Sequence, residues 1–358
     1  MTFRLLLSGH DTVECSYYLR PSSDCQIDFE QLAVEREGLR QSKNRDPKPI
    51  TLGGVEFLLH RSGSSRGYPL IISNADCTIE FGEFNNPSFY VTYRSEALWR
   101  DSAWGQHEKF MDWSTRVGLD AFKPETLSRV DFASDYHLPV IDFDEENVVT
   151  LCSKDSRYRD ARKVQTMMFG KGDVVLRIYN KVAEIVEKSH KTWFYGLWDG
   201  VCEDVWRIEW QTRKDILRRF GIRTFIDLKD QQGDLLRYLT HEHTTLRIKG
   251  EDGNRSRWPL HPFWLDLQEQ IKALGAQGVY RVIDRAALVN ERLMRIAIAI
   301  YGYTKQVAAL QCIQRDQRMI SKGEAMAVLG SLIQNVHDPL AWRDGVEKRI
   351  DLIRLGQW

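Results

Sequence analysis

Residues 173–184 (DVVLRIYNKVAE) alternate between apolar and polar side chains, a pattern typical of a half-buried β-strand. Successive side chains of a strand point to opposite faces, so Leu176 and Ile178 share an apolar face. Arg177, Tyr179 and Lys181 share the other face, where a phenol lies between two cations. The pattern therefore predicts a strand with one face for packing and one face suited to chemistry.

Two further stretches, residues 129–135 (RVDFASD) and 205–213 (VWRIEWQTR), show the same alternation. Their polar faces carry charged side chains, namely Arg129, Asp131, Asp135, Arg207, Glu209 and Arg213. If the three strands are neighbours in one sheet, Asp131, Glu209 and Tyr179 lie within reach of a single ligand. Their adjacency is a hypothesis, because alternation along a strand does not say which strands pair.

The remaining patterns predict an α+β protein. Residues 50–93 contain short alternating segments separated by Gly, Asn and Pro, which favour antiparallel strands, and residues 96–122 have the apolar spacing of a helix. We also expect a helix at 145–153 and a turn at 166–173 (TMMFGKGD). Long helical periods follow residue 213. We therefore expect an N-terminal strand, helix and linker (1–50), an antiparallel-sheet domain with packed helices (51–228) and a mostly helical C-terminal domain (229–358).

Composition and charge limit the kinds of partner. The 358 residues are 42% hydrophobic with 11 Trp, enough for a sizeable core, and the formal net charge is zero. Nucleic-acid binding would therefore depend on local patches, such as residues 154–191, where ten Lys and Arg accompany five Asp and Glu. Six scattered cysteines without zinc-site spacing fit a reducing cytoplasmic location. The sequence contains neither a signal peptide nor an apolar run of about 20 residues, so we expect no membrane role.

The polar faces suggest chemistry at a phosphodiester. A nucleophilic tyrosine needs help to lose its proton because its ordinary pKa is about 10, and Arg177 and Lys181 could stabilise the phenolate. Carboxylates could hold Mg²⁺ or Mn²⁺, since Mg²⁺ commonly binds one or two carboxylates with waters and phosphate. Asp131 and Glu209 are the foremost ligands, with Asp135 and Glu184 in reserve. The alternative is an ordinary sheet tyrosine on a salt-bridged face.

The order of these motifs resembles a known family, the replication initiation factors of rolling-circle plasmids, related phages and mobile elements. Residues 177–181 (RIYNK), followed by Glu184, look like the active-site segment of that family. RVDFASD resembles its upstream metal-associated strand, and WRIEW its downstream R-x-E strand. The resemblance covers roughly residues 50–260, including LWRDSAWG before the first motif and NRSRWP after the last.

The resemblance implies a site-specific, single-strand DNA endonuclease and ligase. Tyr179 would attack a phosphodiester of origin DNA, single-stranded or in a cruciform nick site, leaving a 3′ hydroxyl and a 5′ phosphotyrosine. Asp131 and Glu209 would hold Mg²⁺ or Mn²⁺, and Arg177 and Lys181 would assist. The DNA would contact basic residues, namely Arg129, Arg157, Arg159, Arg162, Lys163, Lys171, Arg207 and Arg213. Alternatives are a relaxase that initiates conjugative transfer and a non-catalytic DNA-binding regulator.

Some expectations concern other parts of the chain. No GxxxxGK[ST] motif occurs, so a host helicase would have to unwind the DNA. Second nucleophiles, if any exist, would be Tyr17, Tyr18 or Tyr195. His241-Glu242-His243 is expected at the exposed end of a helix rather than in a metal site. The apolar stripe on the last long helix favours a packing seam, and we expect the C-terminal domain to bind duplex DNA or form a homodimer.

Overall fold

The computed structural model of the protein describes residues 3–43, 45–160, 163–273 and 285–354. The chain divides into two compact units, one formed mainly by Met1–Val282 and one by Ile283–Ile353. This division differs from the expected boundaries at residues 50 and 228, which both fall within the first unit. The N-terminal strand pairs within the central sheet and helices after residue 228 pack on that sheet, so neither segment forms a separate body.

An antiparallel sheet of eleven strands, with the order β2-β3-β4-β5-β6-β1-β7-β12-β11-β10-β9, organises the first unit. Its strands are β1 (Arg4–Pro21), β2 (Lys48–Leu52), β3 (Val55–Leu59), β4 (Leu70–Ser73), β5 (Cys77–Phe81), β6 (Phe89–Tyr93), β7 (Leu119–His137), β9 (Asp155–Asp160), β10 (Lys163–Phe169), β11 (Val174–Asn180) and β12 (Val205–Arg213). A second small sheet pairs β8 (Val148–Thr150) with β13 (Thr244–Leu246). The expected α+β fold with a meander over residues 50–93 is confirmed.

The helices of the first unit are α1 (Phe29–Gln41), α2 (Ser95–Arg116), α3 (Lys181–Glu184), α4 (Phe194–Leu197), α5 (Lys214–Arg219), α6 (Phe225–Tyr238) and α7 (Pro262–Ala273). Short 3₁₀ and π turns are η1 (Glu145–Asn147), η2 (Ile185–Ser189), η3 (Leu239–His243) and η4 (Arg255–Arg257). The expected helix at 145–153 is therefore wrong, because only one 3₁₀ turn precedes β8. The first half of the expected turn at 166–173 belongs to strand β10, which continues to Phe169 before the chain reverses.

The three strands with charged faces are neighbours, as hypothesised, in the order β7-β12-β11. Arg177 of β11 lies opposite Glu209 of β12, and Tyr179 lies opposite Arg207. Arg207 in turn lies opposite Asp135 of β7. Because residues opposite one another project to the same face, the charged side chains of all three strands gather on one surface, which we call the site face.

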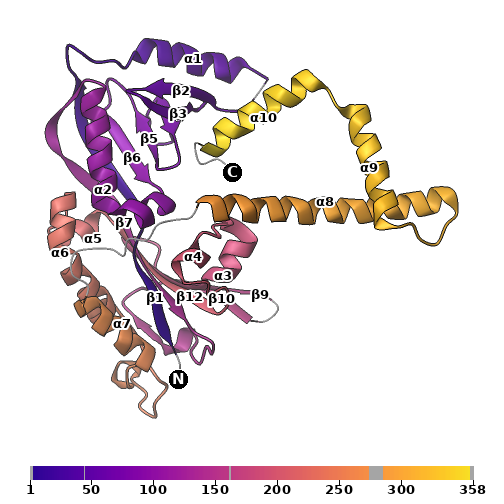
Figure 1. Ribbon diagram of the computed structural model, residues 1–358. Helices are drawn as coiled ribbons and strands as arrows, with labels where there is room; N and C mark the ends of the chain where they lie inside the picture. Colours follow the sequence, from indigo (N-terminus) through magenta and orange to yellow (C-terminus); the bar gives the residue numbers. More distant parts are fainter. Residues whose placement is uncertain (1–2, 44, 161–162, 274–284, 355–358) are drawn as a thin grey trace. The chain divides into compact units, whose positions relative to one another are not determined.

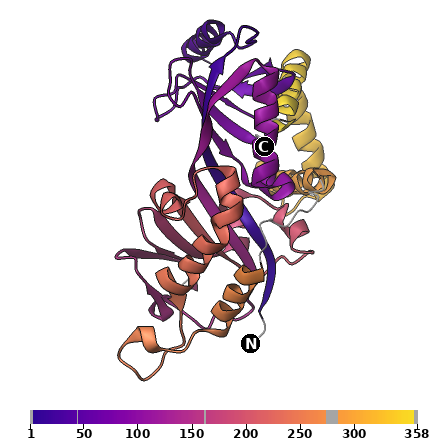
Figure 2. The ribbon, with the colours of Figure 1, turned by 90° about the vertical axis from the view of Figure 1, so that its left-hand side faces the viewer.

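The opposite surface of the sheet, the core face, carries the hydrophobic core. Val130, Phe132, Ile208 and Trp210 project from the central strands into one cluster that also contains residues of α2, α6 and α7. Figures 1 and 2 show α2, α6 and α7 on the same side of the sheet, whereas α3 and α4 lie on the other side. In the described part of the first unit, the short helices α3 and α4 thus lie over the site face.

Helix α2 contacts both the hydrophobic core and the site face because it bends at Ser102, whose φ is 69°. Before the bend, Ser95 and Trp99 donate hydrogen bonds to Asp11 of β1. After the bend, Phe110 and Trp113 are buried in the core against the rings of Tyr17 and Phe57. One helix therefore supports both the core and the buried end of the site face.

The second unit consists of helices α8 (Arg285–Arg315), α9 (Lys322–Val336) and α10 (Pro339–Arg354), which confirms that the last part of the chain is helical. The hydroxyl of Thr304 on α8 contacts the sulfur of Met326 on α9 at 3.4 Å. Many large apolar side chains of these helices are exposed, among them Leu293, Ile296, Ile300, Leu332, Ile333 and Trp342. No helix among the described residues is both long and apolar enough to cross a bilayer.

The buried side chain of His10 on β1 should make the folded protein less stable in acid. Its ring is buried between Trp104 and Phe132, and Nε2 lies 3.1 Å from Oε1 of Gln232 on α6. Burial lowers the pKa of His10 from 6.5 to about 4. Its contribution is thus fully present above pH 6.5 and is lost as the pH falls towards 4, because the unfolded chain binds the proton more tightly. The loss should be about 3 kcal/mol.

Urea unfolding at several pH values would measure this effect. The wild type should be compared with His10→Gln, because burial also lowers the pKa of His60, His107 and His243. The difference in unfolding free energy between the two proteins should shrink as the pH falls. A difference that stays constant from neutral pH to pH 4 would contradict the assignment.

Candidate active site

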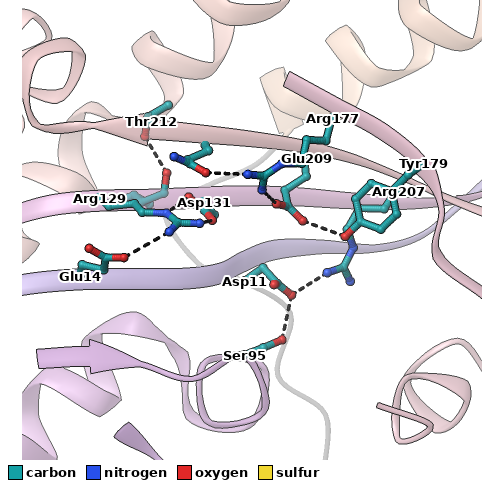
Figure 3. A network of polar contacts seen from close by, with 12 residues as sticks. Asp11, Glu14, Ser95, Arg129, Asp131, Arg177, Tyr179, Arg207, Glu209 and Thr212 are labelled. Carbon is teal, nitrogen blue, oxygen red and sulfur yellow. Dashed lines mark hydrogen bonds and ion pairs between the residues drawn. The ribbon is translucent and has the colours of Figure 1, made fainter. Parts of the chain in front are cut away.

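Tyr179, Arg177 and Glu209 form a hydrogen-bonded group on the site face (Figure 3). The Tyr179 hydroxyl donates to Oε2 of Glu209 at 2.8 Å, and Nη1 of Arg177 donates to Oε1 at 2.7 Å. Arg177 also contacts Oε1 of Gln211 at 2.9 Å. Tyr179 is 9% exposed, and burial together with the Glu209 charge raises its pKa well above 10. The phenol is therefore neutral, with a carboxylate placed to accept its proton.

Asp131 lies beside this group on β7. Nε of Arg129 donates to Oδ1 of Asp131 at 2.8 Å, and Nη1 of Arg129 contacts Oε1 of Glu14 at 3.2 Å. Burial raises the pKa of Asp131 to about 7 against the opposing effect of Arg129, and the charges of Glu209 and Asp11 contribute to the increase. The negative charges of Glu209 and Asp11 therefore disfavour ionisation of Asp131, although Arg129 pairs with it.

Arg207 lies at the buried end of the site and not on a DNA-accessible surface. Its Nε and Nη2 donate to both oxygens of Asp135 at 2.6 and 2.8 Å, and Nη1 donates to Oδ1 of Asp11 at 2.6 Å. Trp198 donates to Oδ2 of Asp135 at 2.9 Å, and Phe194 covers the guanidinium at 4.5 Å. Arg207 and Asp135 are fully buried. The expectation that Arg207 contacts DNA is therefore wrong, and Asp135 is enclosed with it in this buried ion-paired network.

A bulge in β1 supplies Asp11, a residue that the sequence patterns did not single out. The register between β1 and β7 shifts between His10 and Thr12, so Asp11 is the extra residue, and such a bulge redirects a side chain. The neighbouring cations Arg207, Lys191 and Lys181 hold the pKa of Asp11 well below its ordinary range despite burial. Asp11 and Glu14 were missed, although both interrupt the apolar pattern of the first strand.

Lys181 follows β11 as the first residue of α3. It is buried, and its Nζ contacts Oε2 of Glu184 at 2.7 Å. The same atom lies 5.6 Å from the centroid of the Tyr179 ring and 5.0 Å from that of Phe194. Burial and the nearby Arg207 lower the pKa of Lys181. Glu184 thus pairs with Lys181 beside the candidate nucleophile Tyr179.

The other expected site residues occupy varied positions. Arg129 is half-buried, whereas Lys171 and Arg213 are exposed. Arg157 and Arg159 are on β9 and Lys163 is on β10, but their side chains, like the whole of Arg162, lie outside the described residues.

Tyr17 is buried and hydrogen-bonded to Tyr93 and His107, so it is not accessible as a second nucleophile. Tyr18 and Tyr195 are half-buried. In the HEH sequence His241 is exposed, but His243 is buried, which differs from expectation.

The carboxylates suit a hard divalent cation. Within the described residues, no group of three or more His, Cys, Asp or Glu side chains is arranged to hold a metal ion. Asp131 and Glu209 nevertheless provide two oxygen donors on neighbouring strands, and Mg²⁺ commonly binds one or two carboxylates and completes its shell with water and phosphate. Their place on the same face of neighbouring strands is the observation that fits a cation at this pair.

Comparisons with known proteins give a limited result. No protein-family model and no curated protein matches the chain. The structure is similar to that of a rolling circle replication initiator protein from Geobacillus stearothermophilus, with 14% identity, a TM-score of 0.46, and coverage of 77% of this chain and 99% of that chain. It is also similar to the TBP of Methanococcus jannaschii, with 11% identity, a TM-score of 0.25, and coverage of 64% and 96%. The chemistry of this chain must therefore be argued from its own residues.

Proposed function

We propose that this protein nicks and rejoins single-stranded DNA as a rolling-circle replication initiator, with Tyr179 as nucleophile. The observation that carries the proposal is the hydrogen bond from Tyr179 to Glu209, in a group that also contains Arg177. A base within hydrogen-bond distance is what a tyrosine with a raised pKa needs in order to attack. A purely structural tyrosine has no requirement for the carboxylates Glu209 and Asp131 on the same face of the sheet.

The proposed step conserves atoms and charge. The Tyr179 oxygen forms a bond to phosphorus while the phenolic proton passes to Glu209, and the bond from phosphorus to the 3′ oxygen breaks. The products are a 5′ phosphotyrosine and a 3′ hydroxyl, which takes up a proton. Arg177 and Arg129 are placed to balance charge near the phosphate. Reversal of the step by a 3′ hydroxyl would rejoin the strand, because the phosphotyrosine link retains the phosphodiester.

Asp131 and Glu209 are the residues that would hold Mg²⁺ or Mn²⁺. A bound divalent ion would polarise the phosphate and lower the pKa of the attacking phenol. Arg129 and Arg177 already contact these carboxylates, so they hold the two side chains in position on the sheet. Asp135 and Glu184 are paired with Arg207 and Lys181. We favour Asp131 and Glu209 among the four ligands considered from the sequence, because Glu209 contacts Tyr179 and Asp131 lies on the neighbouring strand.

The function can be tested by covalent trapping. Purified protein would be incubated with Mn²⁺ and single-stranded DNA from the region that flanks its gene, and the products separated on a denaturing gel. A metal-dependent protein–DNA adduct, mapped to Tyr179 by mass spectrometry, is expected. No adduct on any flanking strand, combined with intact duplex binding, would instead favour the non-catalytic regulator. A relaxase would share this chemistry, so gene neighbourhood must separate it from a replication initiator.

The metal proposal predicts that Asp131→Asn weakens Mn²⁺ binding by about 10- to 100-fold, because the site loses one of two anionic ligands. The loss of free Mn²⁺ signal during an electron paramagnetic resonance titration would measure the affinity without DNA or activity. Glu184→Gln is the matched control and should bind as the wild type does, since Glu184 pairs with Lys181. Equal affinities for Asp131→Asn and the wild type would remove Asp131 from the metal site.

We also propose that the second unit mediates assembly, as a homodimer. Helix α8 has exposed apolar residues at many successive positions, including Leu293, Met294, Ile296 and Ile298. A helix that is apolar on several sides is normally covered by other helices. Light scattering of the full chain should give the mass of a dimer; a monomer at all concentrations would contradict this assignment. A host helicase remains the expected partner for unwinding.

A further inference from the structure

A row of aromatic side chains continues the site face beyond Glu14. We call it the aromatic strip, and it consists of Tyr18, Tyr68, Tyr90 and Phe122. The ring centroids of Tyr18 and Phe122 are 6.1 Å apart, and those of Tyr68 and Tyr90 are 6.4 Å apart. The strip draws its members from β1, β6, β7 and the segment before β4, so it crosses several strands of the same sheet.

Two cations lie on the rings of the strip. Nζ of Lys123 is 5.5 Å from the centroid of Tyr18 and 5.9 Å from that of Phe122. The guanidinium of Arg66 is 4.3 Å from the centroid of Tyr90. Lys123 is exposed and the Arg66 side chain is 42% exposed. Both cations can therefore reach an incoming phosphate while their stems remain on the rings.

Among the four rings of the strip, Phe122 is the exposed one. Its side chain is 43% exposed on β7, whereas Tyr68 and Tyr90 are buried and hydrogen-bonded through their hydroxyl groups. An exposed ring beside a second ring and a lysine is the combination that binds unpaired nucleotides, since bases stack on aromatic faces and phosphates contact cations. The bases of a duplex are already stacked and are not available to such a surface.

The strip is physically continuous with the candidate active site. Lys123 and Asp131 are on the same strand, β7, eight residues apart, which corresponds to about 26 Å of extended chain. Glu14 connects the two regions, because it contacts Arg66 and Arg129 at 3.2 Å each. Arg66 also pairs with Glu80, so both acidic residues, Glu14 and Glu80, take part in ion pairs. A strand held at Tyr179 could therefore extend along the same face.

We infer that the aromatic strip binds unpaired bases of the DNA strand that Tyr179 attacks. The inference rests on the proposed function for the identity of that strand. It assigns the strip to single-stranded DNA, with stacking on Tyr18 and Phe122 and phosphate contacts from Lys123 and Arg66. The strip would hold the segment next to the cleaved phosphodiester and so would contribute to affinity rather than to the reaction itself.

Fluorescence anisotropy with metal-free protein and a labelled single strand of about 16 nucleotides tests the inference. Phe122→Ala should weaken binding by about 5- to 100-fold through the loss of stacking, and Phe122→Trp should restore it. Duplex DNA of the same sequence should bind equally to Phe122→Ala and wild type. Ile226→Ala is the control for loss of an exposed apolar side chain, because Ile226 is 72% exposed on α6 across the sheet, and its affinity should not change.

A second variant, Lys123→Ala, tests the strip independently in case Phe122→Ala does not fold. Lys123→Ala should weaken single-strand binding and reduce the slope of its salt dependence by about one phosphate contact. Unchanged single-strand affinity in both Phe122→Ala and Lys123→Ala, or an equal loss for duplex DNA, would overturn the inference.

The covalent assay separates this inference from the proposed function. Weaker strand binding by the strip variants, together with no adduct in the wild type, would support a strand-binding strip and overturn nicking by Tyr179. An adduct at Tyr179 together with unchanged strand binding by the variants would support nicking and overturn the strip.

Discussion

Tyr179→Phe is expected to abolish the covalent protein–DNA adduct, with a loss of nicking of at least about a thousandfold, because it removes the attacking oxygen. The substitution removes one atom from a ring that is already packed on β11, and the Glu209 carboxylate keeps its contact with Arg177. The fold should therefore be retained. A denaturing gel with Mn²⁺ and labelled single-stranded DNA would measure adduct formation, and thermal unfolding would measure the fold.

Tyr195→Phe is the matched control for this experiment. It removes a hydroxyl from a half-buried tyrosine of the same unit, and it should not prevent the first adduct from forming. An adduct that persists in Tyr179→Phe would move the nucleophile elsewhere while keeping the enzymatic function. Single-strand binding should persist in Tyr179→Phe, because binding by the aromatic strip does not depend on the Tyr179 hydroxyl.

Arg207→Met is expected to lower the free energy of unfolding by about 3–5 kcal/mol, because it leaves buried carboxylates without their cation. Arg207 contacts both Asp135 and Asp11, and the Arg207 and Asp135 side chains are 0% exposed. Methionine has a similar length and fills much of the space, so the cost arises mainly from the unpaired charges. Urea unfolding monitored by tryptophan fluorescence at neutral pH would measure the change.

The double variant Arg207→Met with Asp135→Asn tests the cause. Removing one of the unpaired charges should recover part of the lost stability, and a double-mutant cycle would give the coupling between the two side chains. Arg213→Met, on the same strand but exposed, should change the unfolding free energy by about 0.5 kcal/mol or less. A loss of similar size for Arg213→Met and Arg207→Met would show that charge removal on β12, rather than burial, causes the effect.

The polar side chains of the site face therefore divide into two groups with different roles. At one end, Arg207, Asp135 and Asp11 form a closed network under Phe194 and Trp198 that maintains the position of the strands. Towards the middle, Tyr179, Glu209 and Asp131 are held by arginines that are themselves partly exposed. Arg207 of the first group, in contrast, is fully buried.

The sequence by itself determined the faces of the three strands and the fold class. Alternation is a local property of an extended backbone, so Arg177 and Tyr179 must share a face, as must Arg207 and Glu209. The same reasoning correctly separated the core residues Ile178 and Ile208 from the charged face. Turn residues and alternating segments were likewise sufficient to predict the antiparallel strands over residues 50–93.

Only the tertiary structure decided which partners each charged residue has. Arg207 and Glu209 are equivalent in the alternation pattern, yet Arg207 is sealed beneath Phe194 while Glu209 contacts Tyr179. That difference depends on α4, which the chain forms between β11 and β12 and which lies over Arg207. Asp11 joins the site through a bulge more than a hundred residues from Asp131 in sequence. Contacts between distant segments decide which helix covers a strand, how two strands align and where a bulge forms. No local periodicity contains that information.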